Sequence, residues 1–238
     1  MRWVALVGPP ASEARFFASL LSARMGAPLV SVHKAAALER AHRTFLGQQL
    51  DAHAAEHAGE LFPLPLVAQL LRPPLERAAR SESGMVGANF PRGREQWRML
   101  RTFAPPAQVI HLTGRPAELR GRIAHRRVCA ACEAPMYPPP EAMAKAAAAE
   151  AEKRSVPRSA ALFSHLVEAG CVEPSPRREK TDEGAPLDTR WAVYEEKTLP
   201  MLAELRESQA TKVIDVEIDV EPDETWKRIL KACDLPYA

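Results

Sequence analysis

Five short, nearly continuous runs of apolar residues stand out along the chain. They are WVALV (3–7), PLVSV (28–32), GMVGA (84–88), QVIHL (108–112) and KVIDV (212–216). Strict alternation of apolar and polar positions is typical of a strand with one face in water, and these runs lack it. They therefore predict buried strands of a parallel sheet that is covered on both faces.

Helical periodicity fills much of the sequence between these runs. The expected helices cover residues 11–26, 63–80, 115–127, 187–208 and 221–233. Pro73 and Pro74 predict an interruption of the second helix, and Pro200 predicts a kink in the fourth. Strands that alternate with helices predict an α/β fold, here a doubly wound, parallel, five-stranded sheet.

Two segments break this alternation and are read as insertions. Residues 33–62 are mostly helical, and residues 128–180 contain an alanine-rich stretch (141–155) with strong helix propensity that is either solvated or packed on a partner. The predicted core therefore has a first part, 1–127, which carries the insertion 33–62, and a returning part, 181–238.

Composition excludes several classes of protein. The chain has 238 residues, of which 46% are hydrophobic, and a net charge of +2 with both signs spread along it, which argues against a dedicated nucleic-acid surface. No apolar run approaches the roughly 20 residues of a membrane span, and no signal-peptide pattern opens the chain. Four cysteines without a secretion signal do not indicate a disulfide framework, and Cys233 is expected to be buried.

The turn after the first apolar run opens like a phosphate-binding loop but continues differently. The general loop pattern is G-x-x-x-x-G-K-[ST], and from Gly8 it meets Glu13, Ala14 and Arg15 in place of glycine, lysine and hydroxyl. Glu13 restricts the backbone and carries negative charge, while Ala14 offers no ammonium group. The favoured interpretation is a strand–turn–helix without phosphate; the alternative is that Arg15 supplies the positive charge.

Six segments in the same order resemble the adenylate kinases, within the wider nucleoside monophosphate kinase group. They are LVGPP (6–10), AGELFPLPLV (58–67), GMVGANFPRGREQ (84–96), RIAHRRVCAAC (122–132), RREKTDEGAPLDTRWAVYEEKTLPML (177–202) and KVIDVEIDVEPDETWKRI (212–229). The resemblance implies a P-loop-type core, with residues 33–62 as a monophosphate-binding lobe and residues 128–180 as a lid. It also implies reversible phosphoryl transfer between Mg-ATP and AMP, which depends on positioning and charge neutralisation.

Several residues of this chain match positions that carry that chemistry in the family. By resemblance, Gly8, Arg92 and Gln96 are nucleotide-binding candidates, while Ala88 replaces an aspartate that helps to organise Mg²⁺ and Phe16 replaces the loop threonine. The arginines that surround the transferring phosphoryl group correspond to four vestigial catalytic candidates, Arg122, Arg126, Arg178 and Arg190. The favoured alternative is that these arginines form ion pairs with nearby acids such as Asp182 and Glu183.

Three cysteines raise the question of a zinc site in the lid. Cys129 and Cys132 match the first half of the zinc-type lid of some adenylate kinases, and Cys171 is placed to open the second half. A closed zinc site needs four ligands, and Pro174 occupies the position of the fourth. Two alternatives stay open: thiols without metal, or a set completed by one of His125, His165 and Glu173.

By resemblance, Val32, Lys34 and Ala37 also replace a hydroxyl, an acid and an arginine of the monophosphate segment. Together with the changes in the loop and at Ala88, these replacements favour an inactive relative. The main hypothesis is a catalytically inactive adenylate-kinase-like protein that serves as a structural or interaction subunit of a larger protein assembly. The alternatives are a diverged phosphotransferase that uses ATP, AMP and Mg²⁺, and a nucleotide sensor that binds without turnover. An intracellular location is expected, with mitochondrial, cytoplasmic and cytoskeletal sites left open.

Overall fold

The computed structural model describes residues 3–103, 106–129, 135–136, 176–177, 179–208, 211–219 and 222–237. Its centre is a five-stranded sheet in which all neighbouring strands are parallel. The strand order is β2 (Leu29–Val30), β3 (Met85–Ala88), β1 (Trp3–Val7), β4 (Gln108–Thr113) and β8 (Lys212–Glu217). The predicted doubly wound α/β fold is therefore confirmed. Each of the five apolar runs coincides with one of these strands, and β4 and β8 each continue one residue beyond their run.

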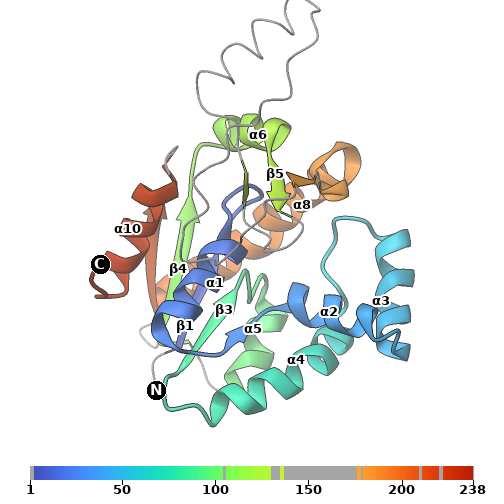
Figure 1. Ribbon diagram of the computed structural model, residues 1–238, viewed down its shortest axis with the longest axis horizontal. Helices are drawn as coiled ribbons and strands as arrows, with labels where there is room; N and C mark the ends of the chain where they lie inside the picture. The colour runs from blue at the N-terminus through green and yellow to red at the C-terminus, as the bar shows by residue number, and fades with distance from the viewer. Residues whose placement is uncertain are drawn as a thin grey trace, which may run out of the picture.

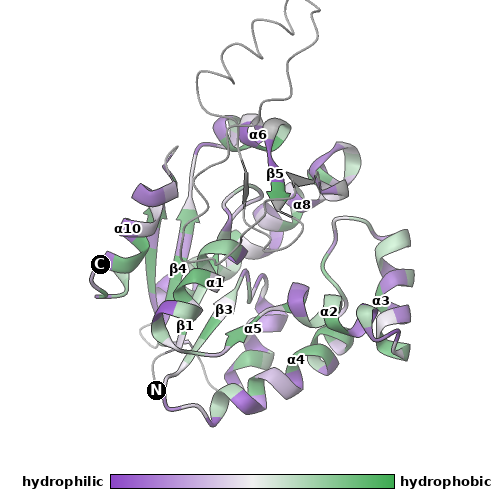
Figure 2. Cartoon of the chain, viewed as in Figure 1, coloured by the Kyte–Doolittle hydropathy of each residue, from purple (hydrophilic) through white to green (hydrophobic). Residues whose placement is uncertain are grey.

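Helices cover both faces of this sheet (Figure 1). Alternate residues of β1 point to opposite sides, so Val4 and Leu6 join one core and Trp3 and Ala5 join others. The first core packs against α1 (Ala14–Met25) and α10 (Pro222–Ala232), and the opposite face packs against α4 (Leu64–Ala79), α5 (Arg94–Arg101) and α9 (Leu199–Glu207). Figure 2 shows the strands coloured as mainly hydrophobic, as this two-sided burial requires.

Two short helices, α2 (Val32–Ala41) and α3 (Phe45–Glu56), occupy the first predicted insertion. The hydroxyl of Ser31 accepts a hydrogen bond from the backbone N–H of Lys34, and Thr44 caps α3 in the same way. Such caps satisfy backbone donors that have no partner at the start of a helix. Helices α2 and α3 lie to one side of the sheet, and α2 packs against α4 (Figure 1).

Helix α4 runs without a break through Pro73 and Pro74, so the predicted interruption is wrong. Each proline removes one backbone hydrogen bond, but the buried face of the helix is apolar on both sides of the pair. Leu70, Leu71 and Leu75 all pack into the core, and this packing holds the two halves in line.

The segments around the second insertion form a small sheet, and two helices joined by a π-helical segment follow it. Helix α6 (Pro116–His125) ends two residues earlier than expected, because β5 (Arg127–Cys129) starts there and pairs with β6 (Pro135–Met136) and β7 (Pro176–Arg177). After the 3-10 turn η2 (Lys180–Asp182), α8 (Gly184–Val193) continues into α9 through a π-helical segment, η3 (Tyr194–Thr198). Pro200 lies at the start of α9, directly after this π-helical segment, and the kink expected at this proline stays a prediction. Most of residues 128–180 lie outside the described residues.

Within the described part of the chain, no helix is both long enough and apolar enough to cross a membrane.

Candidate functional site

The candidate site begins at the loop that joins β1 to α1. Ala11 and Glu13 adopt left-handed backbone conformations, with φ of 64° and 56°, although neither is glycine. The backbone N–H of Ser12 donates to the carbonyl of Pro9 at 3.1 Å, which closes a tight turn. The loop therefore makes a sharp turn without the glycines usual in a phosphate-binding loop. This turn places the Glu13 side chain inside the protein, where it is only 5% exposed.

The Glu13 carboxylate forms a two-point ion pair with Arg126, the residue that follows α6. Arg126 donates from Nε at 2.7 Å and from Nη2 at 3.0 Å, and its own side chain is 5% exposed. Paired N–H donors facing two carboxylate oxygens form one of the stronger hydrogen-bonded arrangements in proteins. The acid of the loop is therefore a partner of an arginine that the resemblance assigns to phosphate.

Asp182 joins the same arginine to a second one. Its two carboxylate oxygens accept from Arg126 Nη1 at 2.7 Å and from Arg190 Nη1 at 2.8 Å. The Asp182 side chain is completely buried, and Arg190 also donates to the carbonyl of Thr181 at 3.0 Å. The ion-pair alternative of the sequence analysis is thus observed with Asp182 for both arginines.

Glu179 neutralises a third guanidinium, that of Arg15 at the start of α1. Arg15 Nη2 lies 3.2 Å from Glu179 Oε2, and Arg126 Nη1 lies 3.5 Å from the same oxygen. Burial alone would raise the pKa of Glu179, but attraction by Arg15 and Arg126 lowers it below its ordinary value. Three arginines and three carboxylates of the described chain therefore balance each other in this region.

Arg92, in the turn between β3 and α5, lies beside this network and has no carboxylate partner among the residues that the structure describes. Its backbone N–H donates to Gln96 Oε1 at 2.8 Å, and its carbonyl accepts from Thr198 Oγ1 at 2.9 Å. Its Nε is buried and has no hydrogen-bond partner among the described residues. Burial, followed by repulsion from Arg190 and Arg15, lowers the pKa of Arg92 to about 10. A partly buried cation beside two other cations favours the binding of an anion.

The remaining predicted residues are placed less centrally or fall outside the description. Gly8 lies close to the Ser12 side chain and has only its backbone to offer a ligand. Arg122 Nη1 donates to the carbonyl of Asp219 at 3.2 Å. Arg178, Cys132 and Cys171 lie outside the described residues, as does the Cys129 side chain, so the zinc prediction stays a prediction. Among the residues that the structure describes, no cluster of three His, Cys, Asp or Glu side chains is arranged to hold a metal ion. Cys233 is buried in the main core, as expected.

Sequence reasoning missed the role of Glu13, the acid Glu179 and a polar network around the buried His111. Glu13 was expected to repel phosphate rather than to bind an arginine, and Glu179 was not considered at all. The network joins His111 Nδ1 to Asp215 at 2.7 Å and His111 Nε2 to the Tyr194 hydroxyl at 2.7 Å, with Arg206 on the carboxylate at 2.6 Å. No local pattern signals these contacts, because their members come from separate elements.

The parallel sheet and the loop and arginines at the carboxyl ends of β1 and β3 define an α/β protein with an adenylate-kinase-like fold. No family model matches the chain. It is similar to the adenylate kinase of Halobacterium salinarum, with 28% identity over 182 residues that cover 74% of this chain and 70% of that protein. This similarity supports a relationship to the adenylate kinase family and a nucleotide-kinase-like protein.

Proposed function

We propose that this protein has the adenylate kinase fold but does not transfer phosphoryl groups, and that it serves as a structural or interaction subunit. The observation that carries the first half of this proposal is the buried Glu13–Arg126 pair. Breaking a buried ion pair by removing one partner costs about 3–5 kcal/mol. A polyphosphate that took Arg126 from Glu13 would meet a cost of this order, about two to four orders of magnitude in affinity.

The residues at the loop also do not suit the magnesium ion that phosphoryl transfer requires. Mg²⁺ prefers oxygen ligands, commonly a loop hydroxyl and a carboxylate together with the phosphates. The corresponding positions hold Phe16, which packs against the main core, and Ala88, which is itself buried in that core. Ala14, in place of the loop lysine, is also buried and offers no charge to a phosphate.

A coupled assay for ADP formation from ATP and AMP with Mg²⁺ tests the absence of transfer. We expect no ADP above the protein-free control, whereas an active adenylate kinase in the same buffer gives a strong signal. Turnover that scales with protein concentration and disappears in a separately purified Arg190→Met variant would overturn the proposal. The variant separates genuine turnover from a contaminating kinase.

Exposed apolar side chains support a role in an assembly. Phe45 at the start of α3 is 74% exposed and Leu38 of α2 is 55% exposed, although both are large and apolar. Exposed apolar side chains that lie together are typical of interaction sites, and α2 and α3, which carry these two residues, contact each other. Size measurements on the native protein test this role: a large particle is expected, and a population that is entirely an uncomplexed monomer would contradict it. The compartment remains the open prediction made above.

The surroundings of Arg92 favour a second candidate function, which is binding of a nucleoside monophosphate without turnover. The motivation is its buried Nε without a partner, close to two further cations. Calorimetry with AMP, ADP and ATP, with and without Mg²⁺, should detect a heat of binding for AMP. The Arg92→Met substitution should abolish this heat. Arg94→Met is the matched control, because Arg94 lies two residues away and forms a half-exposed pair with Glu204. Absence of heat at millimolar AMP would eliminate this candidate.

A further inference from the structure

Helix α2 has one face against the core and the opposite face in solvent. Ala36 is buried in the core, and Val32 and Ala35 pack against it. The exposed residues of the helix follow the spacing i, i+3, i+4 and i+7, which places them together on one face: Lys34, Ala37, Leu38 and Ala41. Three of these four residues are apolar, so the exposed face of α2 carries an apolar stripe.

Phe45 extends this stripe from the next helix. It is the first residue of α3, and it is 74% exposed. The two helices approach closely, since a Cβ added at Gly47 in the first turn of α3 would lie 2.6 Å from the carbonyl oxygen of Glu39 in α2. The stripe and the residues that continue it are called the α2 face: Lys34, Ala37, Leu38, Ala41, Arg43 and Phe45.

The acids nearest to the α2 face already have partners within the protein. The Glu39 carboxylate accepts from the Thr44 hydroxyl at 2.6 Å, and the Thr44 hydroxyl in turn caps α3. The Asp51 carboxylate accepts from Arg40 Nε at 2.6 Å. These contacts use both acids to join α2 to α3. No exposed residue from 34 to 45, all of which the structure describes, is acidic.

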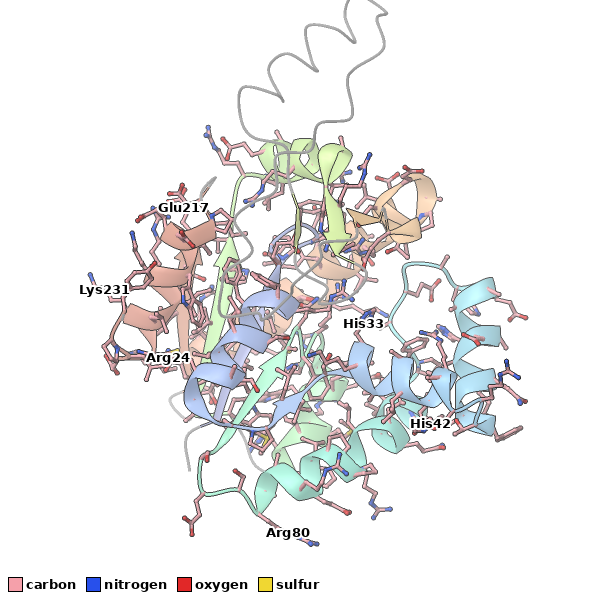
Figure 3. The ribbon with its side chains drawn as sticks, in the orientation of Figure 1. Arg24, His33, His42, Arg80, Glu217 and Lys231 are labelled. Atoms are coloured by element: carbon pink, nitrogen blue, oxygen red, sulfur yellow. The ribbon has the colours of Figure 1, made fainter. Side chains whose placement is uncertain are left out.

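Positive charge lies at both ends of the stripe. Lys34 is in the first turn of α2 and Arg43 follows the end of the helix; both are exposed, and neither forms an ion pair with a described residue. His42, which ends α2, adds positive charge when it is protonated. Figure 3 shows His33 beside the body of the protein and His42 at the far end of α2, next to α3. The α2 face is therefore apolar along its length and basic at its ends.

A second copy of the chain does not complement this pattern. A two-fold interface places the same surface of both copies together. With the two α2 helices antiparallel, Lys34 of one copy would meet Arg43 of the other; with the helices parallel, each cation would meet its own equivalent. Both arrangements bring like charges together, which opposes association. The α2 face therefore fits a partner with the opposite charge.

We propose that the α2 face binds an amphipathic helix of a different protein, and that this helix carries acidic side chains at both ends of its own apolar stripe. This inference rests on the proposed role in an assembly and specifies the partner. Because Ala37 and Ala41 are small, a second helix can approach α2 closely, with Leu38 and Phe45 at the contact. Binding would remove both of these large apolar side chains from water.

The length of α2 sets the spacing of the acids on the partner. The helix has ten residues and is about 15 Å long. The acids that meet Lys34 and Arg43 should therefore lie about three turns apart on the partner helix. Acids at both ends are also favoured over acids at one end, because each cation is exposed and has no ion pair of its own.

Size-exclusion chromatography of the full chain, tagged and extracted from its own cells, tests the inference through substitutions. Leu38→Glu, Phe45→Glu and the double variant Lys34→Glu with Arg43→Glu should each reduce the fraction in the large particle about tenfold or more. Tyr237→Glu is the matched control, because Tyr237 is 51% exposed and lies near the end of the chain. All four variants should melt within about 2 °C of the parent protein, since the changed residues are exposed. Retention of the Leu38 and Phe45 variants in the particle would overturn the inference.

Photocrosslinking identifies what lies on the α2 face in the native assembly. With p-benzoylphenylalanine in place of Phe45, we expect a crosslink to a segment of another protein that has helical apolar spacing and Asp or Glu at both ends. A crosslink to a basic segment, or to a second copy of this chain, would overturn the inference. So would binding of the purified chain to phosphatidylserine vesicles that Phe45→Glu abolishes, because the face would then be a membrane site.

The outcomes separate this inference from the proposed function. If the Leu38 and Phe45 variants stay in a large particle, the α2 face is not the interface, and the role in an assembly still stands. If the parent protein is entirely an uncomplexed monomer, the role in an assembly and this inference fail together. The coupled assay for ADP decides the absence of phosphoryl transfer in either case.

Discussion

Replacing Asp182 by asparagine tests whether the carboxylates of the site hold the fold together. Asparagine keeps the shape of the side chain and one oxygen acceptor but removes the charge. The Asp182 side chain is completely buried and accepts from Arg126 at 2.7 Å and from Arg190 at 2.8 Å. The substitution therefore leaves one negative charge fewer beside two buried or half-buried guanidiniums.

The expected loss follows from this burial. Removing one partner of a buried ion pair costs about 3–5 kcal/mol, and the retained oxygen places Asp182→Asn near the lower end, about 3 kcal/mol. For a chain of this size, each kcal/mol lowers the melting temperature by about 2–4 °C. The melting temperature should therefore fall by roughly 6–12 °C.

Asp188→Asn is the matched control, because it makes the same chemical change in an exposed pair. Asp188 is 71% exposed and meets Arg120 at 3.1 Å, and pairs of this kind contribute about 0–1 kcal/mol. Calorimetric melts of both variants and the parent protein, at low and high salt, give the comparison. Salt should affect the Asp182 difference little, because buried charges are poorly screened. Equal shifts for the two variants would refute the structural role of the carboxylates.

Two further predictions concern the core beneath the site. Burial lowers the pKa of His111 below its ordinary 6.5, although Asp215 opposes the shift, so below about pH 6.5 the unfolded chain binds more protons and stability falls. His111→Phe should reduce the change of melting temperature with pH between pH 5 and 6.5, a range in which the lowered pKa of Asp215 has no effect. The control, His42→Phe on the surface, should keep the pH dependence of the parent protein. Equal slopes of melting temperature against pH for the two variants would contradict this. Gly8→Ala should destabilise by about 1–3 kcal/mol in a denaturant titration, because its Cβ would lie 2.5 Å from Ser12 Oγ; an unchanged midpoint would contradict this.

The strands were predictable because burial on both faces of a parallel sheet leaves a signal within each strand. Every residue of β1 is buried, and the run WVALV shows this directly. Helix α4 was predicted less well, since local reasoning counts the hydrogen bonds lost at Pro73 and Pro74. It does not count the packing of Leu71 and Leu75, which depends on the sheet beneath them.

The sequence indicated candidate positions for a site but not the contacts between them. By resemblance it assigned Arg92 to nucleotide binding and Arg126 and Arg190 to the transferring phosphoryl group, and it identified Glu13 as a departure from a phosphate-binding loop. It did not indicate that Glu13 and Arg126 form a pair, because 113 residues separate them and no local pattern links their positions. Pairing across such a distance is a property of the assembled fold.

The charges of the site explain why the surroundings of Arg126 and Arg190 differ from those of Arg92. Buried arginines are costly unless an anion neutralises them, whether the anion is a ligand or a side chain. Around Arg126 and Arg190 the chain supplies its own anions, Glu13 and Asp182, and this part of the site is stable without a ligand. Arg92 has no such partner among the described residues, so its burial weakens the empty protein. An anion that binds at Arg92 would offset this cost, and the stability of the fold would then rise with phosphate concentration.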